Sequence, residues 1–131
     1  MDSITVKTGK RQEFIDITAE VREYLSKNAY ASGVLTIYCP HTTAALTINE
    51  GADPSVVRDI LVTLEKLIPH QGGYRHSEGN SDAHIKTSLV GPSVQVIVEE
   101  ERPMLGKWQK IFFAEFDGPR SRKIWLKWIG G

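Results

Sequence analysis

Short runs in which apolar and polar residues alternate dominate this chain, and a period of two predicts β-strands. Residues 4–8 alternate, and after Gly9-Lys10 residues 13–17 alternate again, so the chain is predicted to open with a hairpin. Further strands are predicted at residues 33–39, 43–48, 93–99, 108–116 and 123–129. The pattern therefore predicts about seven strands.

Other stretches carry the spacing of amphipathic helices. Thr18 is the expected N-cap of a short helix that ends before Gly33. Asp53-Pro54 is a strong helix start, and apolar residues follow at i, i+3 and i+4 as far as Ile68, so we expect this to be the main packing helix. Residues 83–89 could add one or two turns before Gly91-Pro92. Two to three helices with these strands predict an α+β fold.

Length and composition narrow the class of protein. The 131 residues, without a linker or internal repeat, predict one domain spanning 1–131. Sixteen basic residues balance sixteen acidic ones, so no overall positive field draws the chain to nucleic acid or to a membrane. Cys39 is the single cysteine and the N-terminus has no apolar signal segment, which predicts a cytoplasmic protein.

The last two long strands are apolar on both faces. Such strands lie in the middle of a sheet between two layers, or another subunit covers them. Because a domain of 131 residues has few layers, we predict a symmetric homo-oligomer, with a trimer favoured. Trp125 or Trp128 should then lose exposure on assembly.

The polar stretch YRHSEGNSDAHIK, residues 74–86, contains two of the four histidines. From residue 76 to 83 it fits neither apolar template, so we interpret it as a loop. His76 and His84 would be roughly 12 Å apart along a helix or 26 Å along a strand. They could share a metal ion only if the loop doubles back, and Gly79-Asn80 supplies the residues for that reversal. A solvated surface loop is an equally weighted alternative.

The other two histidines differ in their settings. His41 follows the predicted strand 33–39, where it could serve chemistry or be a rim histidine that one hydrogen bond satisfies. His70 follows the predicted C-terminus of the long helix, after Pro69, and is expected to be a surface residue outside any site.

The strand 108–116 brings charged and amide residues next to a compact cationic turn. Gln109 and Glu115 share its face with apolar residues, while Asp117 and Arg120 fall in the turn that follows. A buried carboxylate must be paired, hydrogen-bonded or bound to a cation, so Glu115 either pairs with an arginine of the same hairpin or belongs to a site. Arg120 could clamp a phosphate by bidentate donation.

Three blocks of the sequence resemble one family. HTTAALTINE-x-ADPSVVRD, YRHSEGNSDAHIKTSLVGPS and GKWQKIFFAEFDGPRSR are similar, in order, to the signature blocks of the YjbQ family, also called secondary thiamine-phosphate synthase. The resemblance implies a mixed, strongly curved sheet, a trimer and a histidine-lined metal site near the subunit interface. The implied metal ligands are His41, His76 and His84, and the other implied site positions are Glu50, Asn80, Glu115, Asp117 and Arg120.

The activity attributed to that family joins an aminopyrimidine methyl pyrophosphate to a thiazole phosphate and releases pyrophosphate. We therefore expect a metal-dependent enzyme, a transferase, that acts on a phosphorylated small molecule. Zinc is the favoured ion because three imidazoles suit it, with magnesium as the alternative beside a substrate pyrophosphate. Glu115 and Asp117 are the candidate catalytic groups, and Asn80, Gln109 and Arg120 the candidate substrate-binding groups. The alternative hypothesis is a non-catalytic trimer that binds a metal or a metabolite.

Overall fold

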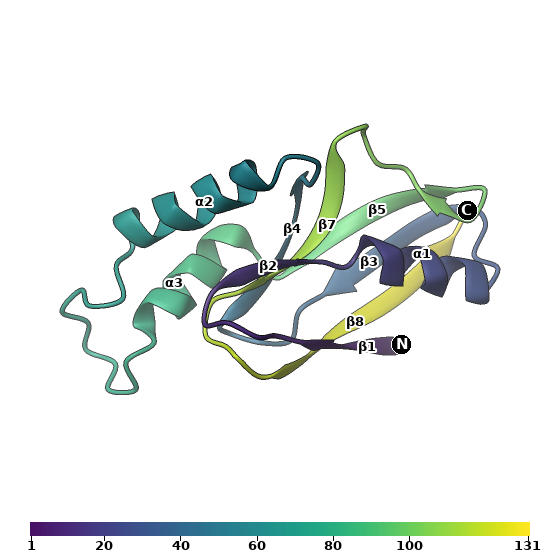
Figure 1. Cartoon of the computed structure of the whole chain (residues 1–131). Coiled ribbons are helices and arrows are strands. Elements are labelled where there is room, and N and C mark those ends of the chain that lie inside the picture. The colour runs from purple at the N-terminus through teal and green to yellow at the C-terminus, as the bar shows by residue number, and fades with distance from the viewer.

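The strands and helices follow one another in the order that the sequence pattern predicts (Figure 1). The structure, a computed structural model, describes all of residues 1–131. Its strands are β1 (Asp2–Lys7), β2 (Glu13–Asp16), β3 (Gly33–Tyr38), β4 (Ala44–Glu50), β5 (Ser93–Glu99), β6 (Arg102–Pro103), β7 (Gln109–Glu115) and β8 (Ser121–Gly130). Its helices are α1 (Thr18–Lys27), α2 (Pro54–Leu67) and α3 (Ser81–Val90). The predicted α+β fold is confirmed, and β6 is the only strand that the pattern did not predict.

The strands form two sheets, and every pair of neighbours is antiparallel. The larger sheet has the order β1-β8-β3-β5-β6 and the smaller has the order β2-β7-β4. The expected mixing of parallel and antiparallel pairs is therefore wrong. Parallel neighbours need a crossover that returns to the same sheet. Here the helical connections run from one sheet to the other, and only β5 and β6 follow each other within a sheet.

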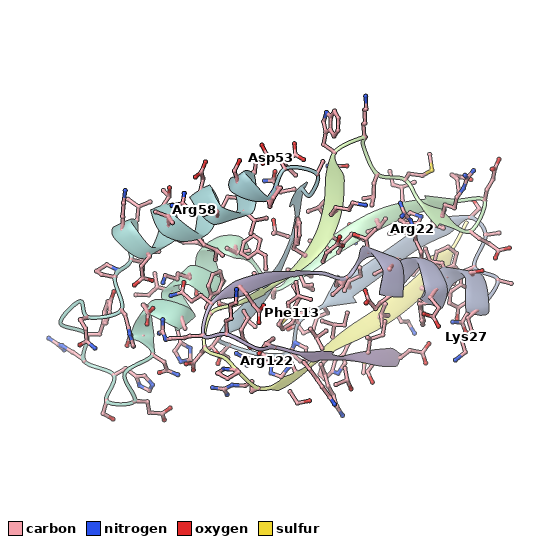
Figure 2. All side chains as sticks on the ribbon, viewed as in Figure 1. Arg22, Lys27, Asp53, Arg58, Phe113 and Arg122 are labelled. Atoms are coloured by element: carbon pink, nitrogen blue, oxygen red, sulfur yellow. The ribbon has the colours of Figure 1, made fainter.

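The main core lies between the two sheets. Its buried side chains come from one face of each sheet and from α1, which contributes Val21 and Leu25. Figure 2 labels Phe113 of β7, a fully buried member of this core. A smaller cluster covers the other face of β7 and β4, where Ala114 and Phe116 pack with α3 and with Leu61 and Leu64 of α2. The double-sided apolar pattern of β7 therefore reflects its position between two layers.

Helix α2 differs from the sequence prediction in its burial. It begins as predicted, because the Asp53 side chain caps it by accepting a hydrogen bond from the Ser55 amide at 2.9 Å. None of its residues is fully buried, and Leu67 is 72% exposed. Helix α2 lies beside α3 at one end of the molecule and is not its main packing helix (Figure 1).

Helix α3 begins inside the stretch that we interpreted as a loop. It starts at Ser81, so the second half of residues 74–86 is helical. The apolar repeat is missing because two charged residues, Asp82 and Lys86, occupy its buried side one turn apart. No helix combines the length and apolar character needed to cross a membrane.

Candidate functional site

A polar cleft of about 690 Å³ opens where four connections meet beside α3. Arg11 reaches it from the β1–β2 connection, His41 from the β3–β4 connection and Asn80 from the α2–α3 connection. The β7–β8 turn and the first residues of β8 complete the wall. Its charged and imidazole side chains are Arg11, His41, His70, Glu78, His84, Asp117, Arg120 and Arg122.

Gly118 lets two of these connections approach each other closely. Its amide donates to the Arg11 carbonyl at 3.0 Å. A Cβ atom at this position would lie 2.4 Å from the Lys10 carbonyl oxygen and 2.8 Å from the Thr8 hydroxyl oxygen. Only glycine therefore fits, and this close approach brings the β7–β8 turn next to Arg11.

His41 is fixed at the edge of the cleft by a backbone hydrogen bond. The Lys123 amide donates to its Nε2 atom at 2.9 Å, so Nε2 is an acceptor and the proton of the neutral ring is assigned to Nδ1. Burial, together with the nearby charge of Arg122, lowers the pKa of His41 below its usual range. His41 therefore faces the cleft as a neutral imidazole at neutral pH.

His84 and His76 lie close together, so the loop between them doubles back as predicted from Gly79-Asn80. Their ring centroids are 5.5 Å apart and the rings meet edge to face. His84 of α3 lines the polar cleft, whereas His76 lines two smaller cavities, one of which His84 also borders, and does not line the polar cleft. His76 Nε2 lies 3.9 Å from a Glu78 carboxylate oxygen. The cleft therefore contains two of the three predicted histidine ligands.

The residues do not fit the predicted zinc ion. No group of three histidine, cysteine, aspartate or glutamate side chains is placed so that it could hold a metal ion. One nitrogen of His41 is already used by the Lys123 amide, and His76 does not reach the cleft. The expectation of a zinc site is wrong because the predicted ligands do not come together as a group that could hold the ion. The magnesium alternative stays a prediction.

His70 lies in the cleft, contrary to our expectation. Its Nε2 atom is 2.7 Å from the Gly79 carbonyl oxygen, and its backbone amide donates to a Glu65 carboxylate oxygen at 3.3 Å. The loop after α2 folds back over the end of that helix. A position just beyond a helix C-terminus gave no signal of this tertiary contact.

Asp117 organises two of the predicted substrate-binding residues. Its Oδ2 atom accepts from Asn80 Nδ2 at 2.9 Å and from Arg120 Nη2 at 3.2 Å, and its carbonyl accepts from Arg120 Nε at 3.0 Å. Half of the Arg120 side chain is exposed and its Nη1 atom has no protein partner. The Asn80 Oδ1 atom is buried and has no hydrogen-bond partner. This side of the cleft thus offers a free donor and a free acceptor.

Glu115 is paired with an arginine of the same hairpin. It is fully buried, and the Arg122 guanidinium donates to both of its carboxylate oxygens while Thr8 donates at 2.8 Å. Burial alone would raise the pKa of Glu115, but these hydrogen bonds lower it. Figure 2 shows Arg122 at the beginning of β8, where it also borders the cleft. Glu115 therefore holds the Arg122 guanidinium in place at the border of the cleft. The predicted catalytic role of Glu115 stays untested.

Gln109 and Glu50 lie outside the cleft. Gln109 pairs with Glu50 at one end of the β4–β7 ladder, and Glu115 pairs with Ala44 at the other, so Gln109 is roughly 20 Å from Glu115 along the strand. Gln109 accepts from the Gly106 amide at 2.8 Å, and Glu50 accepts from the amides that precede α2. Both side chains stabilise local turns.

Sequence reasoning missed Arg11 because its role depends on a distant partner. Arg11 Nη2 donates to both carboxylate oxygens of Asp82, at 2.9 and 3.1 Å. The only signal was the Asp82-Lys86 pair at i, i+4 in a stretch without an apolar repeat.

Comparison with known proteins identifies the family. The family described as "UPF0047 protein YjbQ-like" matches residues 2–131. The chain belongs to the YjbQ (UPF0047) family. It is 54% identical over 125 residues to a UPF0047 protein of Methanocaldococcus jannaschii, covering 95% of this chain and 91% of that protein. It is 50% identical over 131 residues to the UPF0047 protein YugU of Bacillus subtilis, covering 99% of each.

Solved structures of YjbQ relatives share the fold. An uncharacterised conserved protein of the YjbQ/UPF0047 family from Clostridium acetobutylicum superposes with a TM-score of 0.95 at 50% identity, covering 98% of this chain and 100% of that one. A conserved hypothetical protein from Thermus thermophilus gives a TM-score of 0.93 at 41% identity, covering 98% of this chain and 100% of that one.

These findings correct the expected activity. The relatives carry only the name of a family of uncharacterised function, and none of those described is named a thiamine-phosphate synthase. The side chains also lack the arrangement that a metal ion needs. The prediction of a metal-dependent thiamine-phosphate synthase, and with it the assignment as a transferase, is therefore wrong on these findings.

Proposed function

We propose that the polar cleft binds a small hydrophilic anion, a molecule that carries a phosphate or carboxylate group. The support is the chemistry of the wall, which contains three arginines and three histidines and no hydrophobic side chain. Guanidinium groups match phosphate and carboxylate geometry with two parallel N–H donors. A volume of about 690 Å³ suits a small molecule rather than a single ion.

Each arginine of the cleft is held by a carboxylate. Asp82 holds Arg11, Asp117 holds Arg120 and Glu115 holds Arg122. These pairs fix the guanidinium groups before a ligand arrives, which lowers the entropy lost on binding. They also cancel much of the positive charge, so the cleft favours a ligand with a small number of negative charges.

The free Nη1 atom of Arg120 is the observation that supports the proposal most strongly. Two of its nitrogens bind Asp117, which orients the guanidinium, while Nη1 is left for a ligand. The neighbouring Asn80 Oδ1 atom is a buried acceptor without a donor. A buried unsatisfied acceptor costs about 1–3 kcal/mol, which a hydroxyl or amine of the bound molecule would relieve. The expected ligand therefore combines an anionic group with a hydrogen-bond donor.

Calorimetric titration with inorganic phosphate tests this function. The unmodified protein should bind phosphate, and Arg120→Gln should weaken binding by about 1.5–3 kcal/mol, the range for hydrogen bonds to charged groups. Arg102→Gln is the matched control, because Arg102 also pairs with a nearby carboxylate, Glu100, but lies outside the cleft. Absence of phosphate binding, or an equal effect of both substitutions, would overturn the proposal.

The location and assembly of the protein are further parts of this proposal. Cys39 is a free, buried cysteine, which is compatible with the reducing cytoplasm. Towards the end of β8 the outward face is uncovered, since Ile129 is 63% exposed. A trimer that covers this face is the form we propose. Light scattering at micromolar concentrations would report the mass of a trimer, and a monomer would reject it.

A further inference from the structure

A second cavity, which we call the aromatic cavity, adjoins the polar cleft. It has a volume of about 640 Å³. It shares Pro40, His41, Thr42 and His84 with the polar cleft, so these residues form the ridge between the two spaces. The two cavities are therefore neighbours across a ridge that carries two imidazole side chains.

The wall of the aromatic cavity differs in chemistry from that of the polar cleft. Tyr38 of β3 and Trp125 of β8 are cross-strand partners, and their rings are stacked with centroids 5.7 Å apart and planes 18° apart. Both rings line the cavity, and Tyr38 is 42% exposed. Flat aromatic walls favour a planar partner that can stack on them or meet their edges.

One buried polar atom in this wall lacks a partner. Thr87 of α3 is only 8% exposed, and its hydroxyl makes no hydrogen bond within the protein. Buried hydroxyl groups are normally satisfied, because leaving one unpaired is unfavourable. Thr87 lines the aromatic cavity as Asn80 lines the polar cleft, so each space contains one unsatisfied buried group.

We propose that the aromatic cavity binds the planar ring of the same small molecule whose anionic group lies in the polar cleft. The ligand passes over the ridge, the ring lies against Tyr38 and Trp125, and a polar edge of the ring meets the Thr87 hydroxyl. This inference rests on the proposed function and adds the class of ligand, a ring-bearing phosphate or carboxylate. An alternative occupant, a second copy of this chain, is an outcome that the experiment distinguishes.

Two probes of the same charge separate the roles of the two cavities. Methyl phosphate presents the anion without a ring, and phenyl phosphate presents both. Calorimetry should show phenyl phosphate binding about tenfold more tightly, which corresponds to roughly 1.4 kcal/mol. Tyr38→Ala should remove that difference and leave methyl phosphate binding unchanged. Ser88 is an exposed residue that lines the aromatic cavity. Ser88→Phe should also abolish the tighter binding of phenyl phosphate, because the larger side chain fills the cavity.

Tyr30→Ala is the matched control. Tyr30 stacks on Trp128, with ring centroids 4.7 Å apart, but lines neither cavity, so this substitution should keep the preference for phenyl phosphate. Equal affinity for both probes would overturn the proposal that the aromatic cavity binds a ring, and would leave the proposed anion binding in the polar cleft unaffected. Failure of inorganic phosphate and both probes to bind would overturn both. A change of oligomeric mass in Tyr38→Ala, with equal probe affinities, would assign the cavity to a contact between copies.

Discussion

Lys86 Nζ lies 3.1 Å from Asp82 Oδ2, one helical turn away on α3, and both side chains are fully buried. Asp82 also accepts two hydrogen bonds from Arg11, and Lys86 contacts a Glu65 carboxylate oxygen at 2.6 Å. These charges join α3 to α2 and to the β1–β2 connection. The helix that carries His84 and the connection that carries Arg11 are thereby fixed relative to each other.

Replacing Lys86 should strongly destabilise the protein. Lys86→Met removes a buried charge and leaves Asp82 with Arg11 as its only cationic partner, so the free energy of unfolding should fall by about 3 kcal/mol. Urea denaturation measures this change, and Lys66→Met, at an exposed position of α2, should change stability by less than about 0.5 kcal/mol. An equally small effect of Lys86→Met would refute the structural role of the buried pair.

Acid should unfold the protein through its paired carboxylates. Hydrogen bonds from charged partners overcome the opposing effect of burial and lower the pKa values of Glu115 and Asp82. The folded state then binds fewer protons than the unfolded state, so this stability is present above the ordinary carboxyl pKa, near 4, and is lost as pH falls through the lowered values.

Denaturation curves between pH 7 and pH 3 measure this dependence. Glu115→Gln should be less stable at pH 7 and should lose less stability on acidification. Asp59→Asn, at an exposed position, should keep the slope of the unmodified protein. A slope unaffected by Glu115→Gln would show that this carboxyl does not contribute.

His41 should remain neutral at pH values where an ordinary histidine is half protonated. Burial and the charge of Arg122 lower its pKa, so its ring should titrate with a midpoint below about 6.5. Nitrogen NMR should find the proton of the neutral ring on Nδ1, because Nε2 accepts from Lys123. A midpoint above that value, or a proton on Nε2, would contradict the arrangement.

Arg120→Lys separates two roles of the guanidinium. The substitution keeps the charge but loses the planar fork. If Arg120 holds the ligand, phosphate affinity should fall by about 1.5–3 kcal/mol while the melting temperature changes little. If the contact with Asp117 is only structural, the melting temperature should fall and the affinity should stay the same. The second result would remove Arg120 from the site.

The sequence predicted the strands well because their burial follows a period of two. The predicted strand at 93–99 matches β5, that at 33–39 is one residue longer than β3, and that at 108–116 extends one residue beyond β7 at each end. Helix α3 was harder to find because charges that find partners elsewhere in the fold occupy its buried side. An apolar repeat identifies helix residues that are buried against other apolar side chains, but it does not identify charged residues that are buried because they form ion pairs.

The site was predicted in part for a similar reason. His41, Asn80, His84, Asp117 and Arg120 all line the cleft, and all but His84 stand beside a turn signal or strand end in the sequence. His70 and Arg11 were missed, and His76 was misplaced, because loop packing decides their positions. The resemblance to the family identified the motifs that carry these histidines, but it did not show where the folded 70–80 loop places each imidazole.

Mapping phosphate binding by amide NMR tests the central claim most directly. Titration with inorganic phosphate should shift the amide signals of Asn80, Arg120 and Lys123. The Lys123 amide reports on the cleft because it donates a hydrogen bond to His41 at the edge of the cleft. The basic residues Arg22 and Lys27 of α1 lie at the opposite end of the molecule and should not respond (Figure 2). Shifts centred on α1, or no saturable shift at the cleft, would contradict an anion-binding cleft in this protein.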